Sequence, residues 1–316
     1  MGKAPAITPA IVGCNVTRMS RKNYDVVTFE RFVDRYLDSP ADAFAFQQSA
    51  VQVYPLSLAV ARMRPPTPLF RAEYSFLLLF QAGGGQQQVD NETLDLHAND
   101  VLFIREGHLN AIRSIDEGTR GYYIHLDNRL LPHIFTDRAL LHRLTFYPKH
   151  AVSAADMAWL GQCCELILGQ PGNQGPAEEI QCALLRAMVL KVAQASATTL
   201  CQPDRPSEVT MRFKELVYEH VATNREVAFY ASVLAVSENY LNRCVRQLTG
   251  KPPKQHLNEL VILRSKVLLQ DRSKDIAQVA AALNFSDPSY FGRLFRQVAR
   301  QTPTAYRNAL SHGLSD

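Results

Sequence analysis

The sequence predicts an α+β protein with more than one domain. Three observations support this prediction: short apolar runs cut by turn residues between about 53 and 127, helical periodicity after residue 153, and a proline-containing linker at 196–207. The 316 residues are 47% hydrophobic and 20% charged, which suits about two folded domains and excludes a disordered chain. A strand-rich N-terminal part is therefore expected to precede an all-helical C-terminal part.

The strand-rich part is expected to fold as a small barrel or a sandwich, because its runs are short and closely spaced. Alternation in one run places Ile124 and Leu126 on one face of a strand, and Tyr123 and His125 on the other. One of these faces is expected to be core and the other to meet water or a ligand. The glycines at 83–85 are interpreted as a hairpin turn, because no lysine and helix follow them as in a phosphate loop.

The N-terminal 60 residues give a weaker pattern. The run from Thr28 to Leu37 allows either a short helix before Ser39-Pro40 or an irregular arm, and both alternatives stay open. After the strands, Ser153 begins a capping box for a helix that runs to Gly169.

A second helix is expected after Pro176, and its apolar girdle is too wide for one partner surface. That helix either packs under the barrel or also forms a subunit contact. We therefore divide the chain into an N-terminal domain (1–152), a helical pair for dimerisation (153–195), a linker (196–207) and a C-terminal helical domain (208–310).

The charge is concentrated in the last third of the chain. The net charge is +4, and residues 205–316 hold 16 basic residues against 10 acidic ones. Such a basic domain favours a nucleic-acid partner. No apolar run reaches the roughly 18 residues of a membrane helix, and Pro5 and Pro9 interrupt any N-terminal signal peptide. We expect a cytoplasmic protein without a membrane partner and with its six cysteines reduced.

The C-terminal domain contains an internal duplication. A helix at 227–234, a short break and a helix from the cap Ser237 to Leu248 form the first copy. The pattern recurs from Val279, with Ser286 as the cap of a helix that ends at Val298. A helix at about 254–270 lies between the copies. Each copy has the form of a helix-turn-helix, whose second helix fits the major groove of DNA.

The outward side chains of the two second helices are candidate DNA contacts, because Asn pairs with adenine and Arg with guanine. Helical spacing directs Tyr240, Leu248 and Tyr290 toward the core. The candidate DNA-binding residues are Asn239, Asn242, Arg243 and Arg246 in the first copy, and Ser289, Arg293 and Arg296 in the second.

These repeats resemble the DNA-binding domain of the AraC/XylS family of bacterial transcription regulators. The motif residues are Val227-Ala228-Phe229-Tyr230-Ala231, Leu234, Ser237, Tyr240-Leu241 and Arg243 in the first copy, and Ile276, Val279-Ala280, Leu283, Phe285, Ser289-Tyr290-Phe291, Arg293, Phe295-Arg296, Pro303 and Tyr306-Arg307 in the second. Asn284 and Arg300 stand where the family usually has Gly, and Val261 where it often has Arg.

The resemblance implies a sequence-specific regulator, an activator, that works with double-stranded DNA and RNA polymerase. The helical pair at 153–195 is expected to make it a homodimer. Asn239, Asn242, Arg243, Ser289 and Arg293 occupy the family's base- and backbone-contacting positions.

The N-terminal part resembles the family's effector domain, a cupin-like antiparallel β-barrel with helices, more weakly. Asn99 to Gly107 resembles the strand and turn of the second cupin motif, and the resemblance implies an unidentified small-molecule effector. Metal-binding cupins have a His-x-His pair where this chain has Gln86-Gln87-Gln88, and a later His where it has Asn110.

His97, His108 and His125 do not restore the metal-ligand spacing and are interpreted as loop or surface residues. We expect no metal, no cofactor, no catalytic residue and no enzymatic activity. Two alternatives remain: control of the N-terminal half by a protein partner, and a metal-dependent cupin enzyme.

Overall fold

The computed structural model describes residues 26–37, 50–169, 175–196 and 204–312. The N-terminal prolines, Ser39-Pro40, Cys14 and Cys201, and most of the expected linker lie outside these residues. The strands are β1 (Val26–Val27), β2 (Val51–Pro55), β3 (Phe70–Ala72), β4 (Ser75–Ala82), β5 (Gly85–Val89), β6 (Glu92–Leu96), β7 (Asp100–Ile104), β8 (Leu109–Ile115), β9 (Arg120–Leu126) and β10 (Lys149–Ala151).

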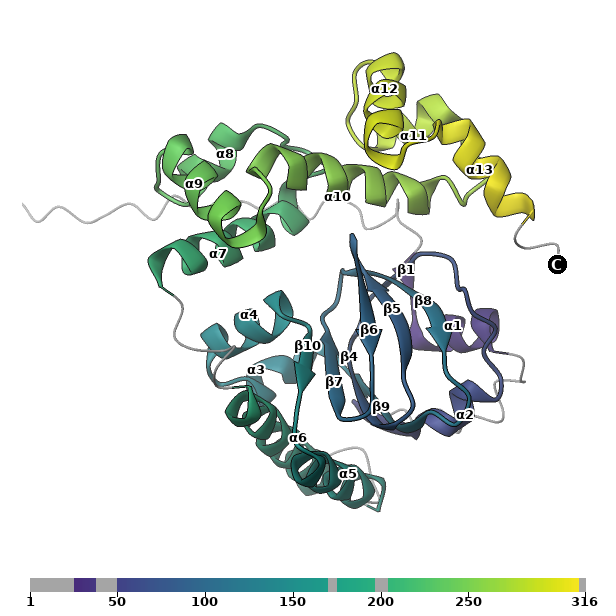
Figure 1. Ribbon diagram of the computed structural model, residues 1–316, viewed down its shortest axis with the longest axis vertical. Helices are drawn as coiled ribbons and strands as arrows, with labels where there is room; N and C mark the ends of the chain where they lie inside the picture. Colours follow the sequence, from purple (N-terminus) through teal and green to yellow (C-terminus); the bar gives the residue numbers. More distant parts are fainter. Residues whose placement is uncertain (1–25, 38–49, 170–174, 197–203, 313–316) are drawn as a thin grey trace, which may run out of the picture.

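Helices accompany these strands and form the rest of the chain (Figure 1). Those of the N-terminal half are α1 (Phe29–Tyr36), α2 (Leu56–Val60), the 3-10 turn η3 (Asn128–Leu130), α3 (Leu131–Ile134), α4 (Arg138–Phe146), α5 (Ala154–Leu168) and α6 (Pro176–Ala195). Those of the C-terminal half are α7 (Arg205–His220), α8 (Val227–Val233), α9 (Glu238–Thr249), α10 (Pro253–Leu268), α11 (Ile276–Ala282), α12 (Pro288–Ala299) and α13 (Pro303–His312).

The strands form two open five-stranded sheets, so the structure supports the predicted sandwich and not the closed barrel that the family resemblance implies. Their orders are β1-β3-β8-β5-β6 and β10-β7-β4-β9-β2, and no edge strand of one sheet pairs with the other. All pairs are antiparallel except β1 with β3. The segment at 83–85 links β4 of one sheet to β5 of the other, so the hairpin interpretation was wrong. A Cβ on Gly84 would lie 1.9 Å from the Leu96 carbonyl oxygen, so the link requires glycine there.

The sheet that contains β4 is buried on both faces. Leu79 and Ile124 pack on one face against Leu160 of α5 and Leu185 of α6. Phe76 and other alternate residues of β4 face the second sheet and α1. The opposite orientations of Ile124 and Tyr123 confirm the alternation predicted along β9.

The run after Thr28 forms the short helix α1 and not an irregular arm, so the structure supports the first of the two alternatives. The Thr28 hydroxyl caps it by accepting a hydrogen bond from the Arg31 amide at 3.2 Å. Its inner face buries Phe29, Phe32 and Val33 against the sheets. The expected cap of α5 is also present, because the Ser153 side chain accepts from the Asp156 amide.

Helix α10 is the axis of the C-terminal half. It contains 16 residues, which gives a length of about 24 Å. Figure 1 shows α8 and α9 at one end of α10 and α11, α12 and α13 at the other. Leu257, Val261 and Leu268 on α10 are buried in a core shared with both helix pairs. Val261, at a position where the resembled family often has Arg, is therefore a packing residue.

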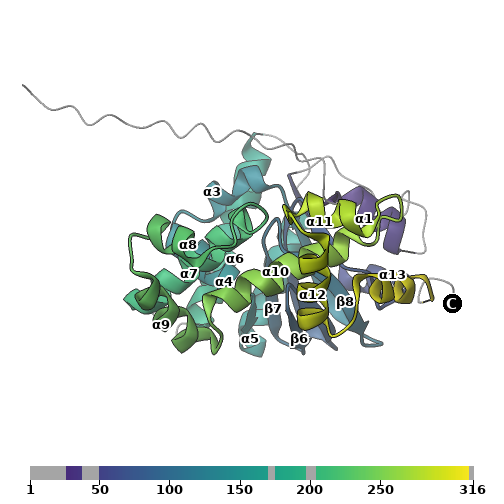
Figure 2. The same cartoon turned by 90° about the horizontal axis from the view of Figure 1, so that it is seen from above.

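The two halves meet where α7 and α10 lie over one end of the strands (Figures 1 and 2). The Asp90 carboxylate, in the turn after β5, accepts a hydrogen bond from the Tyr218 hydroxyl of α7 and lies 2.7 Å from His108 Nδ1. Its other oxygen accepts from the Leu109 amide at 3.0 Å. Burial raises the pKa of Asp90, but the neighbouring His108 ring and the three hydrogen bonds outweigh this effect, so the pKa of the carboxyl lies below its usual value.

Further contacts widen this junction. An Arg264 guanidinium N–H of α10 donates to the Tyr218 carbonyl, and the Gln270 side chain donates to the Leu69 carbonyl at 2.8 Å. Leu69 and Leu109 share the apolar core of α10. The two halves are thus joined by a packed interface, in which a buried carboxylate has three hydrogen-bond partners.

We predict that Tyr218→Phe lowers the free energy of unfolding by about 1–3 kcal/mol, because it leaves a buried carboxylate without one donor. Urea denaturation at pH 7.5 measures this change. Tyr290→Phe, which removes an exposed hydroxyl from α12, is the matched control and should change stability by less than about 0.5 kcal/mol. Equal effects of the two substitutions would contradict a stabilising role for the Asp90 contact.

A second prediction concerns pH. Burial lowers the pKa of His125 and that of His150 to about 4, against about 6.5 in an unfolded chain. Between about pH 6.5 and 4 these histidines are protonated in the unfolded state but neutral in the folded state. Their full contribution to the free energy of unfolding is therefore present above about pH 6.5 and is lost as the pH falls. We expect each histidine to remove about 2 kcal/mol between pH 7.5 and 5.

Urea denaturation of His150→Phe at both pH values isolates the contribution of one histidine. The variant should lose about 2 kcal/mol less stability on acidification than the unaltered chain. The side chain of His97 is 74% exposed, so His97→Phe should keep the original pH dependence. Identical slopes for His150→Phe and the unaltered chain would refute the assignment.

Candidate functional site

The second helix of each predicted pair presents polar side chains outward. In α9, Asn239, Arg243 and Arg246 are exposed and Asn242 is half-buried. Leu241, Cys244 and Val245 fill the inner face. In α12, Ser289, Arg293 and Arg296 are exposed over a core of Phe291, Leu294 and Phe295. The structure thus places every candidate DNA-contacting residue on one of two helices, α9 and α12.

Local contacts hold part of the α9 surface in place. The Asn242 side chain donates to the Glu238 carbonyl at 3.0 Å. The Arg243 guanidinium lies 5.1 Å from the centre of the Tyr240 ring, within the range of a cation–π contact. Ser237 caps α9 by accepting from the Tyr240 amide, as the sequence predicted. The start of α9 is therefore ordered before any partner binds.

The start of α12 differs from the prediction. Asp287, not Ser286, caps the helix by accepting from the amides of Ser289 and Tyr290. Asp287 can be the N-cap because Pro288 follows it as the first helical residue and has no N–H that needs a partner. The same carboxylate lies 3.9 Å from Arg293, whose side chain is 77% exposed. Arg293 is therefore held only loosely on the surface of α12.

Two residues expected in the core are exposed. Leu248 near the end of α9 is 36% exposed, and Tyr290 at the start of α12 is 46% exposed. Tyr290 stands beside Ser289 and one turn before Arg293. Helical spacing alone assigned it to the apolar stripe, because its direction at a helix start depends on the cap. Tyr290 is therefore a surface residue of α12 that the sequence did not reveal.

The turns of the two units contact each other through one arginine. Arg225, between α7 and α8, donates to the carbonyls of Leu283 and Asn284 at 2.6 and 2.7 Å. Its guanidinium lies 4.0 Å from the Phe285 ring centre. Asn284 has a positive φ of 56° and donates to the Ala222 carbonyl at 3.0 Å. Asn thus replaces Gly here and also contacts the first unit.

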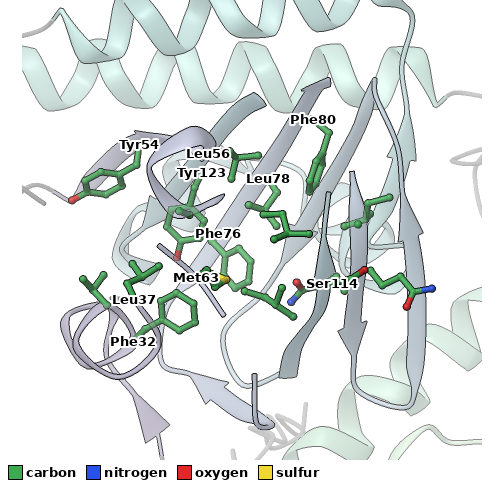
Figure 3. A pocket seen from close by; sticks show the side chains of 18 of the residues that line it. Phe32, Leu37, Tyr54, Leu56, Met63, Phe76, Leu78, Phe80, Ser114 and Tyr123 are labelled. Carbon is green, nitrogen blue, oxygen red and sulfur yellow. The ribbon is translucent and has the colours of Figure 1, made fainter. Parts of the chain in front are cut away.

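A cavity in the N-terminal half forms a second candidate site. It contains about 850 Å³ of space, its open mouth included. Figure 3 shows Phe76, Leu78 and Phe80 of β4 directed into this space, with Phe32 of α1 and Tyr123 of β9 around it. The pattern of β9 indicated that Tyr123 faces water or a ligand, but nothing in the sequence indicated that α1 forms a wall.

The histidines of the N-terminal half are less exposed than the sequence suggested. His97 and His108 lie in loops, as predicted, although His108 is buried against Asp90. His125 lies within β9 and is half-buried with its Nδ1 covered, so its interpretation as a loop or surface residue was wrong. The three histidines lie in different places, and the described residues contain no group of three or more His, Cys, Asp or Glu placed to hold a metal ion. Cys163, Cys164, Cys182 and Cys244 are free thiols. Within the described ranges, no helix is long and apolar enough to cross a membrane.

Comparisons with known proteins point to the same helices. A family model described as a helix-turn-helix domain matches residues 230–309. The HTH-type transcriptional activator RhaR of Mannheimia succiniciproducens is 23% identical over 80% of this chain and 92% of its own length. The uncharacterized HTH-type transcriptional regulator YisR of Bacillus subtilis is 26% identical over 34% of this chain and 38% of its own length.

Solved structures with a similar fold include ToxT from Vibrio cholerae O395. It is 14% identical, with a TM-score of 0.43, over 82% of this chain and 97% of that chain.

Proposed function

We propose that this chain is a DNA-binding transcription regulator of the AraC type, with the helix-turn-helix domain at residues 230–309 as its DNA-binding part. In this proposal α9 and α12 enter major grooves of specific DNA sites. The contacting residues are Asn239, Asn242, Arg243 and Arg246 on α9, and Ser289, Arg293 and Arg296 on α12. The observation that supports this most is that all seven side chains lie on the two second helices, outside the core. We add Tyr290 as a contact from the start of α12.

We further propose that this regulator activates transcription, as the name of RhaR says of that relative. Contact with RNA polymerase and a cytoplasmic location are part of the same proposal. RhaR and YisR are both named as transcriptional regulators, which supports a regulator and not an enzyme. The cavity favours a small-molecule effector over a protein partner as the controlling signal, since it is an apolar pocket between two sheets, the kind of place where small ligands bind. The units proposed from the sequence, 1–152, 153–195 and 208–310, remain our working division of the chain.

Substituting the two matching arginines tests the DNA assignment. Arg243→Ala and Arg293→Ala should each weaken specific binding by about 1–3 kcal/mol and relax the base preference at one position of the site. Binding is measured by fluorescence anisotropy on sites selected from random DNA, at a fixed moderate salt concentration. Arg120→Ala, an exposed position on β9, is the control and should leave affinity unchanged.

Two results would refute these assignments. One is unchanged affinity in both Arg243→Ala and Arg293→Ala while the variants stay folded. The other is an equal loss on specific and random DNA, because a contact to phosphate alone weakens both.

We propose that α5 and α6 dimerise the regulator. Apolar side chains are exposed on these two helices more than elsewhere among the described residues. They are Trp159, Leu166, Leu168, Ile180 and Leu190. Soluble monomers rarely expose a large contiguous apolar patch, which supports a second copy of the chain as the covering partner.

Leu190→Glu should therefore shift the chain from dimer to monomer, because a buried unpaired carboxylate opposes association. Sedimentation velocity at micromolar concentration measures the change. Val233→Glu is a matched control, since Val233 of α8 is also exposed (47%) but lies outside α5 and α6. A chain that is monomeric before substitution would contradict the proposal.

A further inference from the structure

The cavity between the two sheets has, in its described part, a lining without charged side chains. Among the described residues that line it, none is Asp, Glu, Lys, Arg or His. Its walls are aromatic and aliphatic, with contributions from α1, α2 and both sheets. The lining can therefore bury apolar surface but offers no ionic partner to a charged ligand.

Few polar groups face this space. Gln87 of β5 is 4% exposed and is paired in register with Ile112 of β8. Its neighbours along the strand direct their amides elsewhere, Gln86 to the Asp95 carboxylate and Gln88 to the Asp90 carbonyl. No hydrogen bond joins the Gln87 side chain to another part of the described chain. An amide at this position can both donate to and accept from a ligand.

The aromatic hydroxyl groups of the lining stay neutral. Burial raises the pKa of Tyr54 to about 12, and the Tyr54 hydroxyl already donates to Gln52 at 2.6 Å. Burial also raises the pKa of Tyr74 and that of Tyr123. His125 packs against the Tyr74 ring at 4.7 Å, and burial lowers its pKa to about 4. None of these three tyrosines and this histidine is charged near neutral pH.

We propose that this cavity takes a neutral, mainly apolar molecule with one hydroxyl or carbonyl group that hydrogen-bonds to Gln87, and that it rejects carboxylates and sugars. This inference rests on the proposed function, because it specifies the effector class of the same cavity. The aromatic lining, the absence of ionic groups from it and the buried free amide are the three observations that support it.

The rejection of other ligand classes follows from the cost of desolvation. A carboxylate would lose its hydration and meet no cation in the lining, so its binding would be heavily penalised. A sugar carries a hydroxyl group on nearly every carbon, and the wall has too few polar partners for them. A single hydroxyl or carbonyl group finds its partner in one amide.

A series of three ligands that differ in one group tests the inference on the full chain. Butylbenzene, 4-butylphenol and 4-butylbenzoate share an apolar body and differ in polarity and charge. Isothermal titration at pH 7.5 should give the tightest binding for 4-butylphenol, with butylbenzene about three- to tenfold weaker. 4-Butylbenzoate should bind at least about thirtyfold more weakly than 4-butylphenol.

Variants identify the group responsible. Gln87→Leu should abolish the preference for 4-butylphenol over butylbenzene, because it removes the amide. Gln88→Leu, on the same strand but outside the cavity lining, should retain that preference. Ile112→Trp should weaken the binding of all three ligands, because the larger side chain fills part of the cavity. Circular dichroism checks that each variant is folded. If a variant does not fold, the comparison of the three ligands on the unaltered chain still tests the inference.

The inference is overturned if 4-butylbenzoate binds as tightly as 4-butylphenol, if none of the three ligands binds, or if Gln87→Leu keeps the full preference. DNA affinity measured in the same samples separates this failure from failure of the proposed function. A chain that binds specific DNA but takes the carboxylate refutes the ligand class alone. A chain that takes the phenol but binds no specific DNA supports the ligand class and refutes the assignment of α9 and α12.

Discussion

The Asp90 carboxylate is buried between a sheet and a helix that belong to different halves of the chain. It has three hydrogen-bond partners, and two of them, His108 and Leu109, come from the N-terminal half while Tyr218 comes from α7. Removing an ionised carboxylate from water is costly, so the folded state keeps these partners together. The position of α7 and α10 over the strand ends therefore depends on this contact as well as on the packing of Leu69 and Leu109.

The same strands connect this junction to the cavity. Gln87 of β5 lines the cavity and lies three residues before Asp90, a span of about 10 Å along a strand. Ile112 of β8 also lines the cavity, and Leu109 at the start of β8 contacts both Asp90 and the α10 core. Two hydrogen-bonded strands thus reach from the cavity wall to the DNA-binding half.

Much of the functional surface could be predicted from the sequence, because helix-turn-helix units are local and repeat. Helical spacing predicted the outward arginines of α9 and α12. Alternation along β9 predicted the opposite orientations of Ile124 and Tyr123. The exposure of Tyr290 was missed because it depends on which residue caps α12. The choice between a sandwich and a barrel, the wall formed by α1 and the burial of His108 could not be predicted, because they depend on contacts between residues distant in the chain.

Helices α9 and α12 are themselves held at a fixed separation. Helix α10 packs against both units, and Arg225 bonds the turn of the second unit from a loop of the first. A ligand in the cavity can change DNA binding only to the extent that its affinity differs between two arrangements of the chain. Since α10 and Arg225 restrain the two units relative to each other, we expect the proposed effector to act at the junction around Asp90, where the two halves meet. Its signal would then move the pair of units as one body relative to the sheets and leave the spacing of α9 and α12 unchanged.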